Sequence, residues 1–280
     1  MAIGEKAMLI HLHIREWTAR KYDKAVSNKV KDDYQAKKDA GRYNKQLIAK
    51  EKIKEIRRIV LAIRTYNDEN TLPWDDNGVR MLPAANYLDY VKEMNRFKSE
   101  FEIEVREFLQ IYPDIIDAEA QRLGDMFNKD DYPDMATIEK KYSFTTKIVP
   151  VPNGDDFRVT LNEDEVSSIK DEITKKVAQS TKVAMQDLWK RLFKVVEHMI
   201  DRLSDKTNKF NDSVVGNIES LCDILPKLNV TNDSQLAQSV NDIKNELTKY
   251  EPQALRDDKE IRNKTADAAQ KILNKMKSYQ

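Results

Sequence analysis

The chain has 280 residues, of which 40% are hydrophobic and 34% charged, and its formal net charge is zero. It contains only 6 glycines and 8 prolines, and this composition favours long helices with wide solvated faces over a compact α/β enzyme, which normally carries more glycine. No stretch approaches the roughly 18 consecutive apolar residues of a membrane-spanning helix, and the first residues lack a signal-peptide pattern, so we expect a cytoplasmic protein without membrane contact.

The zero net charge conceals three segments of different charge. Residues 1–65 carry 17 basic and 8 acidic side chains, residues 66–172 carry 12 and 25, and residues 173–280 carry 19 and 15. A basic first segment beside an acidic middle segment is typical of a nucleic-acid contact, but also of a basic arm that docks on the acidic middle or on a neighbouring copy. The sequence leaves both interpretations open.

The first predicted elements are a short strand and a long helical arm. Apolar residues alternate along residues 8–14, and this period of two predicts a strand. Residues 23–42 contain few apolar side chains and are expected to project into solvent. A helical arm follows, with one apolar stripe at 4-3-4-3 spacing that consists of Ala49, Ile53, Ile56, Val60 and Ile63.

A turn-rich connection at residues 67–83 leads to a second helix. Residues 87–112 carry aromatic side chains at helical spacing, which predicts a packed core; a surface that stacks nucleic-acid bases is the alternative. Pro113 is expected to interrupt this helix. The acidic residues 130–134 lack the spacing and central glycine of a calcium loop, so we interpret them as a solvated capping turn rather than a cation site.

Two further strands are predicted around an Asn-Gly turn. Residues 143–150 and 156–161 alternate in polarity, and Asn153-Gly154 between them is a turn signal. A two-stranded ribbon is marginal in water, so residues 8–14 are the expected third strand of an antiparallel sheet. This arrangement predicts that Ile10 or Leu12 lies near Phe157 or Val159.

The C-terminal part is predicted to be entirely helical. An apolar stripe runs from Val166 to Leu203, about forty residues, and is expected to pair antiparallel with the arm that ends at Ile63. Shorter helices follow, separated by Pro226 and Pro252. We therefore expect a mainly α protein with long antiparallel coiled-coil-like helices, a small three-stranded antiparallel β-sheet and a C-terminal helical bundle, divided into residues 1–205 and 206–280.

No motif for catalysis, for a cofactor or for a metal is present. The sequence lacks a Walker A pattern, a Rossmann glycine fingerprint, HExxH, a CxxC pair and GxSxG. His11 and His13 share one face of the first predicted strand and could ligate a metal with a distant carboxylate, but a solvated face explains them more simply. The single cysteine, Cys222, fits a reducing compartment and a buried apolar position rather than a nucleophile. We expect no enzyme activity, no cofactor and no metal.

Two groups of residues are candidates for contacts with partners. The candidate nucleic-acid contacts are the basic residues near the N-terminus, namely Arg15, Arg20, Lys21, Lys24, Lys29 and Lys31. They do not fall on one tight helix face, and acidic residues interleave with them, so a solvated helix surface is the alternative. The candidate loop for a protein partner consists of Pro152, Asn153, Gly154 and Asp155, although a plain hairpin turn also accounts for it.

Five segments together resemble an uncharacterised phage and prophage family that carries only a domain-of-unknown-function label. They are LIHLHIREWTARKYD, WDDNGVRMLP, FKSEFEIEVREFLQIYPDII, LGDMFNKDDYP and IVPVPNGDDFRV, within about residues 8–165. The resemblance supplies no catalytic residues. It implies a protein in the cytoplasm of the host cell, often encoded beside a MoxR-type AAA+ ATPase and a von Willebrand A-type protein, and hence a conceivable adaptor role.

The sequence thus favours a non-enzymatic helical scaffold or interaction protein that self-associates or binds a partner helix. An AAA+ ATPase is one possible partner. The alternative is a nucleic-acid-binding protein, active in DNA metabolism or counter-defence, that uses the basic N-terminal residues.

Overall fold

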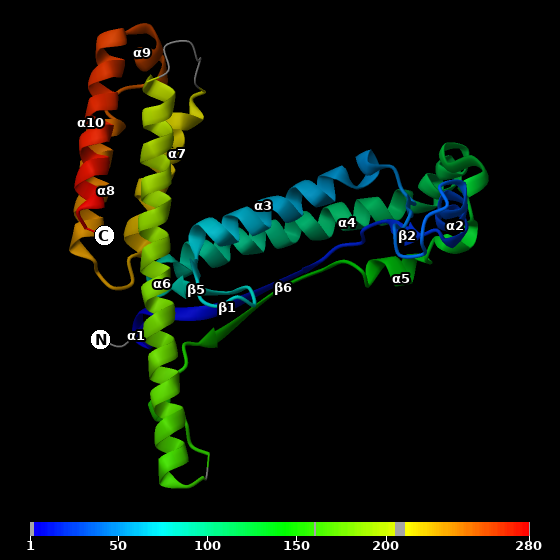
Figure 1. Cartoon of the computed structure of the whole chain (residues 1–280), viewed down its shortest axis with the longest axis horizontal. Coiled ribbons are helices and arrows are strands. Elements are labelled where there is room, and N and C mark those ends of the chain that lie inside the picture. The colour runs from blue at the N-terminus through cyan, green and yellow to red at the C-terminus, as the bar shows by residue number, and fades with distance from the viewer. Residues whose placement is uncertain (1–2, 160, 205–210, 280) are drawn as a thin grey trace. The chain divides into compact units, whose positions relative to one another are not determined.

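The computed structural model describes residues 3–159, 161–204 and 211–279, and the described chain is mainly helical, as predicted (Figure 1). It divides into two compact units, each made of separate segments. Unit 1 comprises Met1–His11, Asn67–Tyr90 and Lys147–Gln280, and unit 2 comprises Leu12–Tyr66 and Val91–Thr146. The predicted boundary near residue 205 lies outside the described residues.

The sheet has four strands rather than the predicted three. Its strand order is β4-β5-β1-β6, and the strands are β1 (Ala7–Arg15), β4 (Leu72–Pro73), β5 (Val79–Pro83) and β6 (Ser143–Pro150). β5 pairs antiparallel with both β1 and β4, and Ile10 of β1 faces Arg80 of β5. The predicted strands at 8–14 and 143–150 are confirmed.

The predicted strand at residues 156–161 is wrong for the residues that the structure describes. Residues Gly154–Asp156 form a 3-10 turn (η5), in which the Asn153 side chain accepts a hydrogen bond from the amide of Asp155, and residues 157–159 and 161 are not in a strand. The sheet is instead completed by β4 and β5, which lie on the side of β1 away from β6. Their residues were predicted to be a connection. The reason lies in the turn before β5, where the Asp75 carboxylate accepts hydrogen bonds from the amides of Asn77 and Val79 and Gly78 adopts a φ of +79°.

The core of unit 1 is built on one long helix, α6 (Glu163–Ser204). α6 packs against α7 (Ser213–Leu228) and α10 (Lys259–Lys277), and α10 packs against α8 (Ser234–Leu247) and α9 (Pro252–Asp257). Along α6, buried apolar side chains recur every three or four residues at Ala184, Leu188, Leu192, Val196, Met199 and Leu203, and Trp189 beside Leu188 is also buried. The predicted stripe is thus used, and its partners within unit 1 are the C-terminal helices.

Two arginines of unit 1 bind the last carbonyl groups of α3 (Lys54–Asn70). Arg191 donates to the carbonyl oxygens of Glu69 and Thr71, both at 2.9 Å, and pairs with Asp187 at 2.7 Å. Arg80 donates to the carbonyl oxygens of Asp68 and Thr71 at 3.0 and 3.1 Å. The final turn of a helix leaves carbonyl groups without intrahelical partners, and these guanidinium groups satisfy them.

The core of unit 2 consists of aromatic side chains, as predicted for residues 87–112. Phe101 and Phe108 of α4 (Tyr87–Leu123) are buried, and each contacts the ring of Tyr142 in an edge-on geometry, with centroids 6.3 and 6.0 Å apart. Trp17 packs edge-on against Tyr112 at 5.9 Å. The prediction that Pro113 interrupts this helix is wrong, since α4 continues through it to Leu123.

Shorter elements complete the described chain. They are α1 (Ile3–Lys6), β2 (Arg20–Tyr22), α2 (Lys24–Asp33), β3 (Asn44–Gln46), α5 (Met135–Glu139) and the 3-10 turns η1 (Lys50–Ile53), η2 (Ala84–Asn86), η3 (Gly124–Met126) and η4 (Lys129–Asp131).

Candidate functional site

Residues 20–46 of unit 2 form a basic hairpin with a helix at its turn, and we call them the basic tip. β2 and β3 pair antiparallel, with Lys21 opposite Lys45, and α2 lies between them in sequence. Asp23 caps α2 by accepting a hydrogen bond from the amide of Val26 at 3.0 Å. No residue of α2 is buried. The tip contains nine Lys or Arg residues and four Asp residues.

A buried ion-pair network fixes the base of the basic tip. Lys45 is only 4% exposed, and its Nζ lies 2.6 Å from Asp131, 3.4 Å from Asp23 and 2.6 Å from the carbonyl oxygen of Met126. Burial alone lowers the pKa of Lys45, but the hydrogen bonds and charges of Asp131 and Asp23 outweigh it and raise that pKa. The carboxylates of Asp23 and Asp131 are therefore both held by the buried ammonium group of Lys45.

The six basic candidate residues have different surroundings in unit 2. Lys21 pairs with Asp131 at 2.8 Å, Lys31 lies 3.5 Å from Asp32, and Arg20 donates to the Gln46 side chain at 3.1 Å. Arg15, Lys24 and Lys29 have exposed side chains. Lys21 and Lys45 thus attach the basic segment to the acidic middle segment, which was one of the two interpretations of the charge distribution. Of the other basic residues of the tip, Lys31 is half-buried and the rest are exposed.

Three exposed tyrosines accompany these cations and were not predicted as contact residues. Tyr22, Tyr34 and Tyr43 are 47%, 80% and 38% exposed. The guanidinium of Arg42 lies 5.8 Å from the ring centre of Tyr22. The sequence contained a signal for this exposure. The segment has so few apolar residues that it cannot form a core in which its tyrosines would be buried.

A second exposed surface lies in unit 1 along the first part of α6. Residues 163–179 of this helix contain no buried side chain, and we call them the α6 arm. Its apolar positions, Val166, Ile169, Ile173 and Val177, are half-buried. The arm is therefore a helix with an apolar stripe that is only partly covered within the chain.

The predicted partner loop packs beside this arm. Gly154 is buried, and a Cβ atom on it would lie 2.9 Å from the carbonyl oxygen of Lys170 and 3.3 Å from the side chain of Thr174. Pro152, Asn153 and Asp155 are exposed. The glycine is thus needed for close approach to α6, and only the other three residues of the loop face solvent.

Charge is segregated along the α6 arm and the turn that follows it. Residues 163–172 carry five acidic side chains and one basic side chain, whereas residues 173–182 carry three lysines and no acidic side chain. The acidic half lies at the helix N-terminus, where negative charge is favourable.

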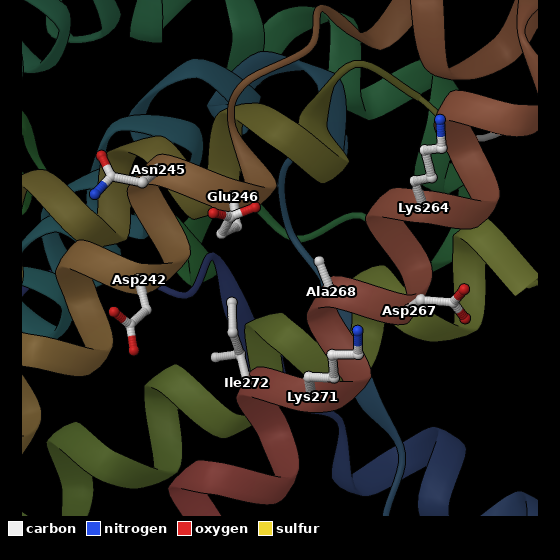
Figure 2. Close-up of a pocket in the computed structure, with 8 residues that line it drawn as sticks. All are labelled: Asp242, Asn245, Glu246, Lys264, Asp267, Ala268, Lys271 and Ile272. Atoms are coloured by element: carbon white, nitrogen blue, oxygen red, sulfur yellow. The ribbon is translucent and has the colours of Figure 1, made fainter.

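A shallow groove of about 490 Å³ lies between α8 and α10 in unit 1 (Figure 2). Its lining carries both signs of charge, from Asp242, Glu246 and Asp267 on one hand and Lys264 and Lys271 on the other. Asp242 is held by Lys275 at 2.6 Å. In Figure 2 the charged groups are spread around the rim and do not converge on one point, so we assign the groove no chemistry.

Among the residues that the structure describes, the remaining chemically active side chains form no recognisable site. Within residues 3–159, 161–204 and 211–279, no group of three or more His, Cys, Asp or Glu residues is placed to hold a metal ion. Cys222 is buried, and burial raises the pKa of its thiol to about 11, which is typical of an inert structural cysteine. None of the described helices combines the length and apolar character needed to cross a membrane.

Comparison with known proteins identifies one family. A family model described as a protein of unknown function, DUF3150, matches residues 5–225. Comparison with curated proteins and with solved structures gives no match.

Proposed function

Since the chain belongs to the DUF3150 family, whose function is unknown, we propose that it is a non-enzymatic helical interaction protein that binds a protein partner through exposed helix surfaces. The observation that carries this proposal is the α6 arm, seventeen helical residues without a buried side chain but with a half-buried apolar stripe. A helix whose apolar face is incompletely covered is a common contact element for another helix.

The proposal includes an origin, a compartment and a partner class. The sequence resemblance implies a phage or prophage gene, and the single cysteine favours the reducing cytoplasm of the host cell. The same resemblance makes an AAA+ ATPase the first partner to test. In this role the chain is an adaptor, which holds the ATPase and a second protein without catalysing a reaction itself.

Affinity purification of the tagged full-length chain from its native host tests this proposal. We expect a protein to co-purify with the wild-type chain and to be lost when Ile169 and Ile173 are replaced by Asp, because these changes put charge into the apolar stripe of the α6 arm. A matched variant, Ser167→Asp with Ala178→Asp, adds the same charge at exposed positions on another side of the same arm and should retain the partner. Equal recovery with all three chains would contradict the role of the arm.

A second candidate function is nucleic-acid binding, and the basic tip is the observation that favours it. Exposed lysines and arginines attract phosphate groups, and exposed tyrosines stack on unpaired bases, so single-stranded nucleic acid is the form that fits this surface. Lys21 is a poor probe, because it is already paired with Asp131.

A salt titration tests this second candidate. The affinity of the wild-type chain for a single-stranded oligonucleotide should fall steeply with ionic strength, and Lys24→Glu with Lys29→Glu should abolish binding. A control with the same change in charge, Lys92→Glu with Lys259→Glu, should bind as the wild type does. No binding by the wild type at low salt would remove nucleic acid from the list of partners.

A further inference from the structure

One face of the α6 arm, extended by one helical turn to Val183, has the pattern of a self-complementary contact. Glu165, Ile169, Glu172, Lys176, Gln179 and Val183 follow a 4-3-4-3-4 spacing. At 3.6 residues per turn, this spacing keeps the six side chains on one side of the helix. Val183 is 40% exposed, and Glu165, Glu172, Lys176 and Gln179 are also exposed.

The loop at Gly154 does not occupy this face. It approaches α6 at Lys170 and Thr174. These two positions lie roughly 100° or more around the helix from Ile169 and Lys176, counted at about 100° per residue. The face is therefore open to a second helix while the loop stays in place.

When two copies of this face pack against each other in antiparallel orientation, acidic side chains of one copy lie opposite lysines of the other. A two-fold axis that crosses the helix pair at the height of residue 174 places Glu172 opposite Lys176 of the other copy. This pair occurs twice by symmetry. The acidic residues 163–172 of each copy then run along the lysines of residues 173–182 of the other. A parallel arrangement would instead put Glu172 against Glu172 and Lys176 against Lys176, which is unfavourable.

We propose that two copies of this chain pair through their α6 arms in antiparallel orientation. This inference rests on the proposed role as an interaction protein and names a second copy as the occupant of the arm. In this register Ile169 lies opposite the aliphatic part of Gln179, and Val183 at each end lies opposite Glu165 of the other copy. The shared helix is about 30 Å long, since twenty residues rise by roughly that length, so the interface belongs to the small, reversible class.

Pairing within one helix does not compete strongly with this contact. Glu172 and Lys176 are also four residues apart on the same helix, yet among the described residues neither takes part in an ion pair. A pair of this kind between exposed side chains of one helix contributes little to stability. Both side chains remain available to a neighbouring copy.

Substitutions that reverse the charge of Glu172 and Lys176 in the purified full-length chain test the proposal, with the oligomeric state as the measurement. The wild-type mass, followed by sedimentation velocity, should rise with concentration towards that of two chains. Glu172→Lys should leave a monomer, because lysine then faces lysine. Glu172→Lys combined with Lys176→Glu should restore the dimer, and circular dichroism should show equal helix content in all three chains. A wild type that stays monomeric, or a dimer that the single exchange does not weaken, would overturn the proposal.

Cross-linking fixes the orientation. With Ser168→Cys on one tagged copy and Gln179→Cys on another, we expect a disulfide between the two kinds of copy. Two copies of Ser168→Cys should not join, because their positions are about 18 Å apart along the paired helices at 1.5 Å per residue. Joining of the Ser168→Cys copies to each other would show parallel pairing and refute the proposal.

Self-pairing of the α6 arm and binding of a different protein by this arm give different experimental results. If the purified chain is monomeric while affinity purification recovers a partner that depends on Ile169 and Ile173, the arm binds a different protein and the self-pairing is wrong. If the chain dimerises as proposed and no partner protein depends on the arm, the self-pairing stands and the adaptor role is lost.

Discussion

Replacing Lys45 by Met should destabilise the base of the basic tip more than any other single change in residues 20–46. Lys45 Nζ contacts Asp131, Asp23 and the carbonyl oxygen of Met126, and the side chains of Lys45 and Asp131 are only 5% and 9% exposed. Removing one partner of a buried ion pair costs about 3–5 kcal/mol, because the other charge stays buried. Asp131 keeps Lys21 as a partner at 2.8 Å, so we expect about 3 kcal/mol.

Hydrogen exchange is the suitable assay for this prediction, since it reports on unit 2 by itself. The amide of Leu47 donates to the carbonyl oxygen of Ala19 at 2.8 Å, next to β2 and β3. In Lys45→Met, the free energy of opening measured at this amide should fall by the same ~3 kcal/mol. Lys24→Met, on the exposed side of α2, is the control and should leave protection unchanged. A loss below about 1 kcal/mol for Lys45→Met would show that the network contributes little and would refute the reasoning.

The same ion-pair network predicts how the difference in stability between the wild type and Lys45→Met depends on pH. The amide of Val26 and the charge of Lys45 lower the pKa of Asp23, and although burial acts to raise the pKa of Asp131, hydrogen bonds from Lys21 and Lys45 lower it overall. Lowered carboxyl pKa values stabilise the fold above their ordinary values of about 4, and this contribution is lost as pH falls through the lowered values. The raised pKa of Lys45 stabilises the fold below about 10.4, and this contribution is lost as pH rises through the raised value. The difference between wild type and Lys45→Met should therefore be constant near neutral pH and shrink in acid and in strong alkali.

Three further changes test other parts of the fold. Arg191→Met should lower the free energy of unfolding by about 2 kcal/mol in urea titrations, because the Glu69 carbonyl loses a charged donor and the Thr71 carbonyl keeps only Arg80; no change would mean that water replaces Arg191. Gly154→Ala should cost about 1–3 kcal/mol and expose residues 151–157 to proteolysis, because its Cβ would lie 2.9 Å from the Lys170 carbonyl oxygen. Cys222, with a thiol pKa of about 11, should react with a disulfide reagent at pH 8 only after unfolding; fast reaction of the native chain would contradict its burial.

The helical cores were predictable because their signal is local. The aromatic face of α4 and the apolar stripe of α6 recur at helical spacing, and burial at those positions follows directly. The spacing does not identify the partner of a helix, so the packing of α6 against α7 and α10 within unit 1 was not predicted. Pro113 misled the prediction because a proline can remain within a long helix when its neighbours pack well, as Tyr112 does here.

The sheet and the basic tip were less predictable because they depend on residues far apart in sequence. β5 is five residues long and follows an Asn-Gly turn, so its sequence resembles a loop until β1 pairs with it. Lys45 resembles any surface lysine, and only the fold brings Asp131 to it. The exposed tyrosines and the opposite charges of the α6 arm were visible in the sequence, but their exposure could be established only from the packing of the units.

The α6 arm is continuous with a half of the same helix that is packed in the core of unit 1, and this continuity affects how it binds. Starting a helix is the costly step and extending one is not, so residues 180–204 act as a template from which the arm grows. The arm can remain helical without tertiary contacts of its own. An incoming helix therefore meets a surface that is already ordered, and little conformational entropy is lost on contact, so even a small interface can form and release quickly.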